Sequence, residues 1–473
     1  MLDKRHVPVV LALILIVIVV SGCSQQKASV DKAAVTIPAG EKDPAIWGKA
    51  YPLQYESLMK TAEGGQGKSK YKGSDPIDKL SEYPFQLVLL DGWGFGVEFN
   101  EPRGHVLMLK DQLKIDPSRR KAGGVCLSCK TPYAPELKNQ MGLNYFKEPY
   151  DVVHAKIPAK HSELGLSCID CHDEKTMELK ISRWSLNDAL KSMGKDPTTL
   201  THQEKRSLVC AQCHVTYSIK KDKDMKSVDL FYPWAKSKWG NITVEDIEAV
   251  IKSDPANYEW KNNVTGMKLG HIRHPEFELY SNGSTHWSAG VACADCHMPY
   301  ERVGSSKISS HHVQSPLKTD MKACTQCHNQ SPEWLRDRVI YIQDRTNNLM
   351  TRAGNAAAQA AKAIELANKT PNIDQNLLAQ AKQLYEKAYY RVGFISAENS
   401  MGFHNPEEAL RVLGDGLYYA EQSEKKSREA LLKAGFTPPE KFDLELAKYN
   451  KRGTKGLTLK PELVKESTFD GEK

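Results

Sequence analysis

The sequence lacks two patterns that would place it in common function classes. It has no run of basic residues with interleaved aromatic side chains, so nothing in it indicates a nucleic-acid partner. Its apolar run at residues 7–20 is shorter than the ~20 residues that a stably membrane-spanning helix needs. A composition typical of disordered chains is also missing from its 473 residues. We therefore expect a globular fold outside the N-terminal segment.

The N-terminus has the order of features of an export signal. Lys4 and Arg5 precede the apolar run, and Cys23 follows a junction of small residues. This junction resembles a bacterial lipobox, in which Cys23 is lipidated and becomes the mature N-terminus. The alternative is a retained signal anchor with an incidental cysteine. Either one tethers the folded part to the periplasmic side of the cytoplasmic membrane. We assign residues 1–22 to the signal or anchor and the polar residues 23–43 to a linker.

Ten of the eleven cysteines form five Cys-x-x-Cys pairs. The pairs are Cys126/Cys129, Cys168/Cys171, Cys210/Cys213, Cys293/Cys296 and Cys324/Cys327, and the residues that follow them are Lys130, His172, His214, His297 and His328. Cys-x-x-Cys-His is the attachment motif of c-type haem. Two thiols at this spacing reach the two vinyl groups of one porphyrin, and the next residue points its nitrogen at the iron. The pattern predicts five covalently bound haem c groups.

Other uses of these cysteines explain the pattern less well. A zinc site needs two pairs, or one pair and two histidines, to converge on each metal, and it leaves the repeated following histidine unexplained. A thioredoxin-like redox pair does not recur five times in one chain, and disulfides across this spacing are strained. Bound haems would add propionate carboxylates, so the net charge of +7 does not identify a partner.

The chain has enough histidines to give each low-spin haem a second ligand. Four of its 15 histidines follow a cysteine pair, and an electron-transfer haem often takes another histidine on its other face. The candidates for these positions are His6, His105, His154, His161, His202, His271, His274, His286, His311, His312 and His404. His6 lies in the signal segment.

Lys130 sets its haem apart from the other four. A lysine binds iron only as the neutral amine, so its pKa must fall far below the ordinary ~10.4. Burial and the charge of the iron both lower it. If no side chain binds the opposite face of this haem, that face is open for a substrate. The alternative is that Lys130 is a surface lysine and that the haem takes another ligand.

The flanking sequences contain further recognisable motifs. They are Arg103-Gly104-His105, residues 210–217 (CAQCHVTY), His274-Pro275-Glu276, residues 293–299 (CADCHMP), Ser310-His311-His312 and His404-Asn405-Pro406-Glu407. Together with one lysine motif followed by four histidine motifs, they resemble the pentahaem cytochrome c nitrite reductases, which form ammonia from nitrite. The resemblance covers residues 92–412 and implies that the haem at Lys130 is the catalytic one.

The same resemblance implies four distal ligands. They are His105 for the haem at Cys210/Cys213, His286 for that at Cys324/Cys327, His311 for that at Cys168/Cys171, and His404 for that at Cys293/Cys296. His312 remains an alternative to His311, because the loop length here differs by one residue from the family pattern. Pairing across such long stretches of chain cannot be derived from the sequence.

Three residues match the family's substrate pocket. Tyr217 and His274 are placed by their motifs, and an arginine is expected shortly before Cys126. The loop there contains Arg119 and Arg120, of which we favour Arg119. The residue types suit the chemistry, because an arginine holds an anion such as nitrite with paired donors and a histidine donates protons near neutral pH.

The calcium-binding positions of the family are altered in this chain. Many members bind calcium beside the catalytic haem through a glutamate before the pocket tyrosine and a lysine and a glutamine before the pocket histidine. Thr216, His271 and Arg273 stand at these positions here. Thr216 lacks the carboxylate that a calcium site needs. We expect the Arg273 guanidinium to replace calcium in ordering the pocket.

We predict a mainly α multihaem cytochrome c fold with little strand. Residues 44–340 form the pentahaem catalytic core, with short helices at 187–193 and 239–251. Residues 333–368, 373–397 and 405–434 are predicted to be long helices, because alanine is frequent and proline is confined to their starts. Small residues at 356–361 permit close helix packing, and the resemblance implies a homodimer through region 341–437. Residues 438–473 are expected to be a loose polar tail.

Two classes of function are compatible with these features. The first is an enzyme that reduces nitrite to ammonia at Lys130, supplied with electrons by four bis-histidine haems. The alternative is a multihaem electron-transfer cytochrome without its own substrate site. An oxidative enzyme of the hydroxylamine-oxidising type would normally need more haems. Relatives often pair with a small quinol-oxidising multihaem cytochrome in the membrane, which is the electron donor we expect.

Overall fold

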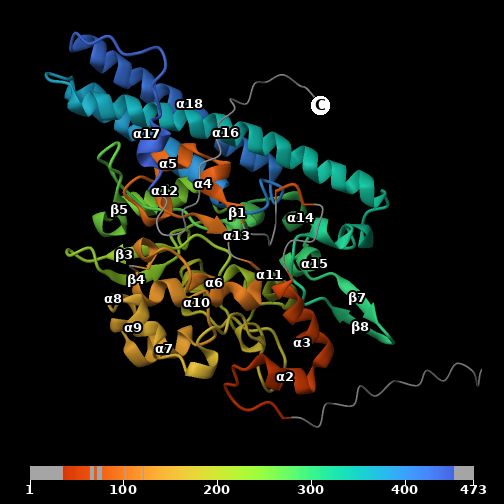
Figure 1. The fold of residues 1–473 in the computed structure, drawn as a ribbon. Coiled ribbons are helices and arrows are strands. Elements are labelled where there is room, and N and C mark those ends of the chain that lie inside the picture. Colours follow the sequence, from red (N-terminus) through yellow and green to blue (C-terminus); the bar gives the residue numbers. More distant parts are fainter. Residues whose placement is uncertain (1–35, 64–68, 72–76, 102, 121, 452–473) are drawn as a thin grey trace, which may run out of the picture.

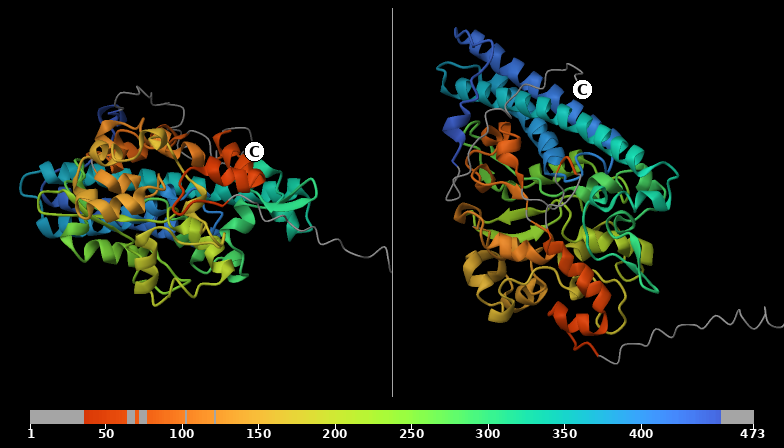
Figure 2. Two further views of the ribbon diagram at one scale, coloured as in Figure 1. Left: turned by 90° about the horizontal axis from the view of Figure 1, so that it is seen from below. Right: turned by 45° about the vertical axis from the view of Figure 1, so that its right-hand side comes forward.

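The computed structural model describes residues 36–63, 69–71, 77–101, 103–120 and 122–451. The signal segment, Cys23 and residues 452–473 lie outside the described residues. A body of short helices and loops is covered along one edge by three long helices (Figure 1), which are α16 (Pro332–Lys369), α17 (Gln375–Ala397) and α18 (Pro406–Lys433). The right-hand view of Figure 2 also shows the long helices along one edge of the body. The predicted fold class, mainly α with long C-terminal helices, is confirmed.

The body is built from many short elements. Its α-helices are α2 (Pro44–Ala50), α3 (Pro52–Met59), α4 (Lys79–Glu82), α5 (Phe85–Leu89), α6 (Met108–Gln112), α7 (Ala134–Met141), α8 (Asn144–Lys147), α9 (Tyr150–His154), α10 (Trp184–Ser192), α11 (His202–Ala211), α12 (Val244–Lys252), α13 (Glu276–Ser281), α14 (Thr285–Ser288) and α15 (Cys293–His297). None of the helices in the described part of the chain has the length and apolarity needed to cross a membrane.

The strands of the described residues pair as two-stranded antiparallel ribbons. They are β1 (Ile77–Asp78) with β2 (Asn100–Glu101), β3 (Ser218–Lys221) with β4 (Ser227–Phe231), β5 (Trp260–Lys261) with β6 (Lys268–Leu269), and β7 (Tyr300–Val303) with β8 (Ser306–Ser309). In the register of the last ribbon, Tyr300 pairs with Ser309 and Val303 with Ser306. This small amount of strand agrees with the prediction.

One short helix begins later than predicted. Residues 239–251 were expected to be helical, but α12 begins at Val244 because the Thr243 hydroxyl accepts from the backbone N–H of Asp246 at 3.1 Å. Trp239 lies outside the helix, and its ring packs against that of Trp287, with 5.7 Å between ring centroids. The prediction was wrong here because a partly buried tryptophan in a loop continues the apolar spacing of a helix.

The small residues of α16 pack inside the chain. Ala357, Ala358, Ala360 and Ala361 are fully buried within the single subunit. At Gly354 of the same helix, an added Cβ would lie 2.4 Å from the ring of Phe85 in α5. The absence of side-chain bulk therefore brings the body against the long helices, and these alanines are not available to a second subunit.

Part of the expected loose tail is ordered. Residues 438–451 run back along α16, where Gln359 exchanges two hydrogen bonds with the backbone of Phe442, at 2.9 and 2.8 Å. Lys362 forms an ion pair with Glu445 and donates to the Tyr449 hydroxyl at 2.9 Å. α19 (Leu446–Tyr449) lies in this segment. The expectation was wrong for residues 438–451, because their polar side chains have buried partners.

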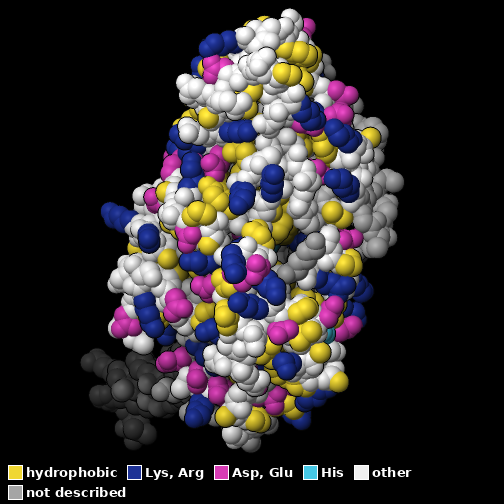
Figure 3. All heavy atoms as spheres, turned by 90° about the vertical axis from the view of Figure 1, so that its left-hand side faces the viewer, with side chains coloured by type: hydrophobic (Ala, Val, Ile, Leu, Met, Phe, Trp, Pro, Cys, Tyr) yellow, Lys and Arg dark blue, Asp and Glu magenta, His cyan; other side chains and the backbone are white. Residues whose placement is uncertain are grey.

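The face of the molecule in Figure 3 has a mixed surface. Basic, acidic and apolar side chains are interspersed over it, and no large area carries charge of one sign.

Candidate haem and active site

A single cavity of about 1900 Å³ lies at the centre of the body of short helices. It is lined by all ten paired cysteines, by Lys130, His172, His214, His297 and His328, and by His105, His286, His311 and His404. None of these ten cysteines is paired in a disulfide. Sequence elements from α3 to α18 therefore converge on one shared interior space, which is the arrangement needed for several large cofactors in contact.

The histidine motifs share one local geometry. The backbone N–H groups of His172, His214 and His328 donate to the carbonyl of the first cysteine of the same motif, at 2.8, 2.9 and 2.8 Å. The motif of His297 lies within α15. Each motif is thus one helical turn, which holds both thiols and the imidazole on the same side.

The lysine motif has a different turn. The backbone N–H of Lys130 donates to the Leu127 carbonyl at 2.9 Å. In three histidine motifs, the carbonyl of the first cysteine accepts from the backbone N–H of the histidine. The Cys126 carbonyl instead accepts from Nε2 of Gln112 at 2.7 Å. The chain therefore turns more tightly before Lys130. Gln112, at the end of α6, was missed by the sequence analysis, because no motif marks it.

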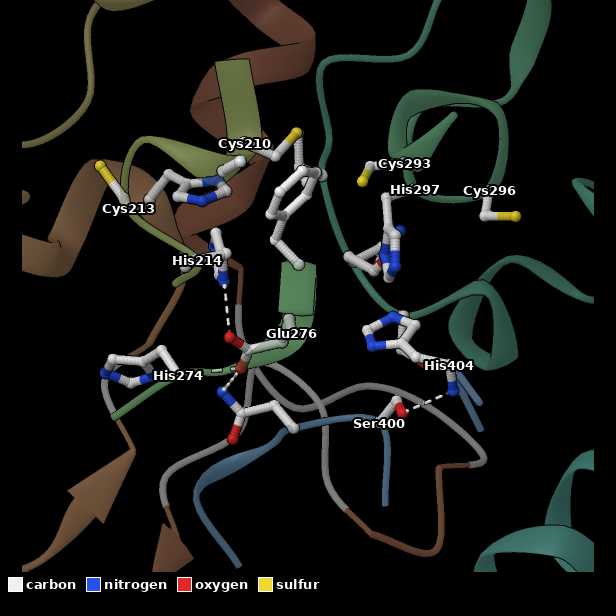
Figure 4. A pocket seen from close by; sticks show the side chains of 18 of the residues that line it. Cys210, Cys213, His214, His274, Glu276, Cys293, Cys296, His297, Ser400 and His404 are labelled. Atoms are coloured by element: carbon white, nitrogen blue, oxygen red, sulfur yellow. Dashed lines mark hydrogen bonds and ion pairs between the residues drawn. The ribbon is translucent and has the colours of Figure 1, made fainter. Parts of the chain in front are cut away.

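Each proximal histidine faces a second histidine. The ring centroids are 6.1 Å apart in His105/His214, 6.2 Å in His172/His311, 6.2 Å in His286/His328 and 6.2 Å in His297/His404. Two imidazoles on opposite sides of one metal ion have ring centres about 6 Å apart, since each metal–nitrogen bond is about 2 Å long. Figure 4 shows the facing rings of His297 and His404. The four pairs are the ones that the family resemblance implies.

Hydrogen bonds to Nδ1 fix the orientation of several of these rings. Nδ1 of His172 lies 2.9 Å from the Met177 carbonyl, that of His297 2.9 Å from the Gln314 carbonyl, that of His311 2.9 Å from the Ser309 carbonyl, and that of His404 2.6 Å from Oε1 of Glu398. An imidazole that donates from Nδ1 keeps the lone pair of Nε2 for a metal. These rings therefore fit iron ligation through Nε2.

Two alternatives left open by the sequence differ clearly in position. His311 lines the cavity opposite His172, whereas Nδ1 of the neighbouring His312 lies 3.3 Å from Nε2 of Gln314. Arg119 also lines the cavity, and its guanidinium lies 4.1 Å from the ring centroid of Phe95. Arg120 does not line the cavity.

The Arg119 guanidinium lies against the ring of Phe95 at the cavity wall. Its Nε is buried and has no hydrogen-bond partner. Burial lowers its pKa below the ordinary value, and the nearby Glu98 opposes this shift. Arg120 instead forms an ion pair with Asp151, with 3.2 Å between Nη1 and Oδ1. Arg119 therefore has an unpartnered Nε donor at the cavity, whereas Arg120 is paired away from it.

Tyr217 and His274 line the same cavity as Arg119 and Lys130. Burial raises the pKa of Tyr217, so its hydroxyl stays protonated near neutral pH. His274 has a positive φ of 48°, uncommon for a residue other than glycine. His274 thus marks a sharp change of backbone direction between Arg273 and the start of α13 at Glu276.

Glu276 lies between two histidines of the site. Its carboxylate oxygens are 3.8 Å from Nδ1 of His214 and 3.9 Å from Nδ1 of His274 (Figure 4), and one of them accepts from Asn399 at 2.7 Å. Burial would raise the pKa of Glu276, but its contacts with the histidines outweigh burial and lower the pKa to about 2. A fixed negative charge therefore joins the haem ligand to the pocket histidine. In the sequence, Glu276 is marked only by its place in the motif His274-Pro275-Glu276.

Comparison with known proteins gives the family. The model of the cytochrome c552 family matches residues 43–472. The chain belongs to the cytochrome c552 family. It is 34% identical over 459 residues to the cytochrome c nitrite reductase subunit NrfA of Nitratidesulfovibrio vulgaris, covering 89% of this chain and 85% of the relative. It is 33% identical over 482 residues to a cytochrome c-552 of Bacteroides fragilis, covering 96% and 94%.

A solved member of the same group has a similar structure. The cytochrome c nitrite reductase of Desulfovibrio desulfuricans matches with a TM-score of 0.77 and 33% identity, over 83% of this chain and 87% of that one. Its description concerns two calcium sites in the catalytic subunit. Membership of the cytochrome c552 family means that this chain carries covalently bound c-type haem, which the paired cysteines and the facing histidines fit.

Arg273 lies at one of the positions where the family resemblance would place a calcium-site residue. Its guanidinium is 3% exposed and pairs with both carboxylate oxygens of Glu259, whose side chain is fully buried. Its Nη1 also donates to the backbone carbonyls of Tyr217 and His271, at 3.1 and 3.0 Å. The Thr216 hydroxyl donates to the Arg273 carbonyl at 3.0 Å. The guanidinium thus gathers the oxygen atoms around the pocket.

Proposed function

We propose that this protein reduces nitrite to ammonia at a haem bound by Lys130, with four bis-histidine haems c supplying the electrons. The observation that carries the proposal is the difference among the five attachment turns. Four of them present a histidine to a second imidazole at 6.1–6.2 Å, whereas the fifth presents Lys130 to the cavity wall with Arg119, Tyr217 and His274.

The residues around the pocket suit the demands of this reaction. Nitrite takes up six electrons and eight protons to give one ammonium ion and two water molecules. Arg119 holds the anion with its guanidinium, whose Nε has no hydrogen-bond partner in the protein. His274 donates protons to the oxygen atoms that leave nitrite. The ionised Glu276 carboxylate beside it favours its return to the protonated form. Bound haem supplies electrons and an open coordination position.

Spectroscopy tests the proposal against the electron-transfer alternative. The electron paramagnetic resonance spectrum of the oxidised protein is expected to show one high-spin haem among five, and nitrite is expected to perturb it. Turnover with a reduced dye is expected to give one ammonium per six electrons. Five low-spin haems that ignore nitrite would refute the proposal and favour the electron-transfer cytochrome.

Arg273 takes the place of calcium in this proposal. Calcium prefers carbonyl and carboxylate oxygens, and the guanidinium binds such oxygens from Tyr217, His271 and Glu259. The Arg273 side chain then supplies the positive charge that holds these oxygens together, as a calcium ion would. One tightly held calcium per chain, measured by elemental analysis after chelation, would contradict this assignment.

The protein is proposed to be a homodimer through its long helices. Support comes from large aromatic side chains that remain exposed there, since Trp334 and Tyr341 of α16 and Tyr418 of α18 are 54%, 47% and 57% exposed. Exposed aromatics are enriched at protein interfaces. Sedimentation of the wild-type protein and of the W334E/Y341E variant tests this proposal. The wild type is expected to sediment as a dimer and the variant as a monomer, and a monomeric wild type would refute the proposal.

The location and the electron donor follow from the N-terminus and the reaction. We place the protein on the periplasmic side of the cytoplasmic membrane, tethered through lipid on Cys23, and a quinol-oxidising multihaem cytochrome in that membrane supplies its electrons. Mass spectrometry of the mature N-terminus and fractionation of wild-type and C23A cells test the tether. An unlipidated Cys23 would contradict it.

A further inference from the structure

Arg183 is the most completely buried arginine near the haem motifs, and the proposed reaction does not use it directly. It precedes α10 as its N-cap residue, and its side chain is 2% exposed. It does not come from any of the five attachment motifs. Its guanidinium is nevertheless bonded to parts of the motifs on several sides.

Two of these bonds bracket the lysine ligand. Nε of Arg183 donates to the Ser128 carbonyl at 2.6 Å, and Nη2 donates to the Thr131 carbonyl at 3.1 Å. Only Cys129 and Lys130 lie between these two carbonyls. The guanidinium therefore holds the chain on both sides of the segment that carries the second thiol and the amine. Arginine is suited to this task because its planar fork of donors reaches several acceptors with fixed geometry.

The same arginine is attached to the second and third haem motifs. Its Nη2 lies 2.7 Å from Oδ1 of Asp170, which stands between Cys168 and Cys171, and the carboxylate is equally buried. Its backbone N–H donates to Oε1 of Gln212 at 3.1 Å, and Gln212 stands between Cys210 and Cys213. The Gln212 amide in turn donates to the Asp170 carbonyl at 2.8 Å.

These contacts share one regularity. Ser128, Asp170 and Gln212 occupy the same place in their motifs, directly before the second cysteine. All three are bonded to Arg183, and all three are buried. Three haem attachment turns are thereby locked to one another through a single residue.

A lysine ligand needs such a lock more than a histidine does. Four ligand rings are oriented by a hydrogen bond at Nδ1, but a lysine amine sits on a flexible stem and has no second nitrogen for this purpose. The Lys130 turn also lacks the backbone bond to its first cysteine that three histidine motifs make. The position of the amine must therefore be set through the backbone.

We propose that Arg183 is a positioning residue that fixes the Lys130 amine against the first haem by holding its backbone to the attachment turns of the second and third. The proposal rests on the proposed function, in that the haem at Lys130 is taken to be the reactive one. Arg183 itself touches neither substrate nor iron.

The R183K variant of the full haem-loaded protein tests this. A lysine keeps the charge beside Asp170 but cannot hold both carbonyls. All five haems are expected to be attached, as measured by haem content, and the four low-spin signals are expected to stay unchanged. The high-spin signal is expected to shift or split, and kcat is expected to fall about tenfold with little change in KM, because misplacement by an ångström is costly to catalysis.

Arg391 provides a matched control. It is 4% exposed, and its guanidinium bonds to Glu245 and Glu248 of α12 and to the Lys387 carbonyl, none of which belongs to a haem motif. R391K is expected to lower the melting temperature as R183K does, with wild-type kcat and an unchanged high-spin signal. If R183K also keeps a wild-type high-spin signal and kcat, Arg183 is merely structural and the proposal is overturned.

A second variant tests the role of Arg183 if R183K does not fold. If R183K does not accumulate, S182A replaces it, because Ser182 Oγ accepts from Nη1 of Arg183 at 2.8 Å. S182A is expected to shift the high-spin signal in the same sense, and an unchanged signal overturns the proposal. If wild-type protein shows no nitrite-sensitive high-spin haem, the proposed function fails and this inference fails with it. A wild-type signal that R183K leaves unchanged removes only the inference.

Discussion

Nδ1 of His404 lies 2.6 Å from Oε1 of Glu398, and the Glu398 side chain is fully buried. Burial alone would lower the pKa of His404, and the carboxylate raises it above the ordinary value. Among the four ligand rings with a bonded Nδ1, His404 alone uses a carboxylate, and the other three use backbone carbonyls. A carboxylate makes an imidazole a stronger electron donor to its metal.

We therefore expect E398Q to raise the reduction potential of the haem at Cys293/Cys296. Loss of the negative charge destabilises the ferric state, and an effect of about 1.4 kcal/mol corresponds to roughly 60 mV for one electron. A potentiometric titration followed by spectroscopy measures it. The other haems serve as internal controls, and an unchanged or lower potential would contradict the role given to Glu398.

Replacing the lysine ligand is expected to abolish most of the activity. K130H restores a standard attachment motif, so five haems are expected to remain bound. Nitrite reduction is expected to fall at least tenfold, about 1.4 kcal/mol in the barrier, because imidazole changes the electronics of the reactive iron. Steady-state ammonium production measures it. Full activity in K130H would mean that lysine is only an interchangeable ligand.

The two adjacent arginines provide a matched pair. R119K is expected to raise KM for nitrite about tenfold, since a point charge replaces the paired donors. R120K is expected to leave KM unchanged, because Arg120 pairs with the exposed Asp151. Steady-state kinetics give KM for nitrite in both variants. A raised KM in R120K with an unchanged KM in R119K would make Arg120 the pocket arginine.

Arg273 is expected to be important for stability as well as for the pocket. R273Q leaves the buried Glu259 carboxylate without its cation, and breaking a buried ion pair in this way costs about 3–5 kcal/mol. Thermal unfolding measures it. The double variant R273Q/E259Q is expected to regain part of the loss. Equal melting temperatures for the two variants would show that the charge of Glu259 is harmless when unpaired.

The contact of residues 438–451 with α16 is expected to weaken in acid. Burial would raise the pKa of Glu365, but Lys362 and its other donors lower it from 4.5 to about 2. A carboxyl whose pKa is lowered by folding stabilises the native state above its unfolded pKa, and this contribution is lost as pH falls from about 4.5 to 2. Pepsin cleavage in 438–451 is expected to rise over this range. E365Q is expected to be cleaved readily at pH 5, where resistance equal to wild type would contradict the argument.

The sequence predicted what local chemistry determines. The haem attachment sites follow from five short motifs, and α18 begins where Asn405 caps its first turn. The long helix α16 follows from its frequent alanine and its single proline at the start, and the Ser331 cap emerged from the structure. The pairing of His105 with His214 is different, because it joins distant parts of the chain and only the family resemblance suggested it. Gln112 and Arg183 could not be found from sequence, since their roles consist of backbone contacts that no spacing rule records.

The central cavity has a consequence for how this protein is made. Its walls come from elements spread along the chain between α3 and α18, so bound porphyrins would fill the space that these elements enclose. A chain carrying too few porphyrins would leave this space to water, whereas α16, α17 and α18 pack on one another through their own buried side chains. Maturation is therefore expected to run from a preformed helical scaffold to a body that closes only when the last porphyrin has been ligated.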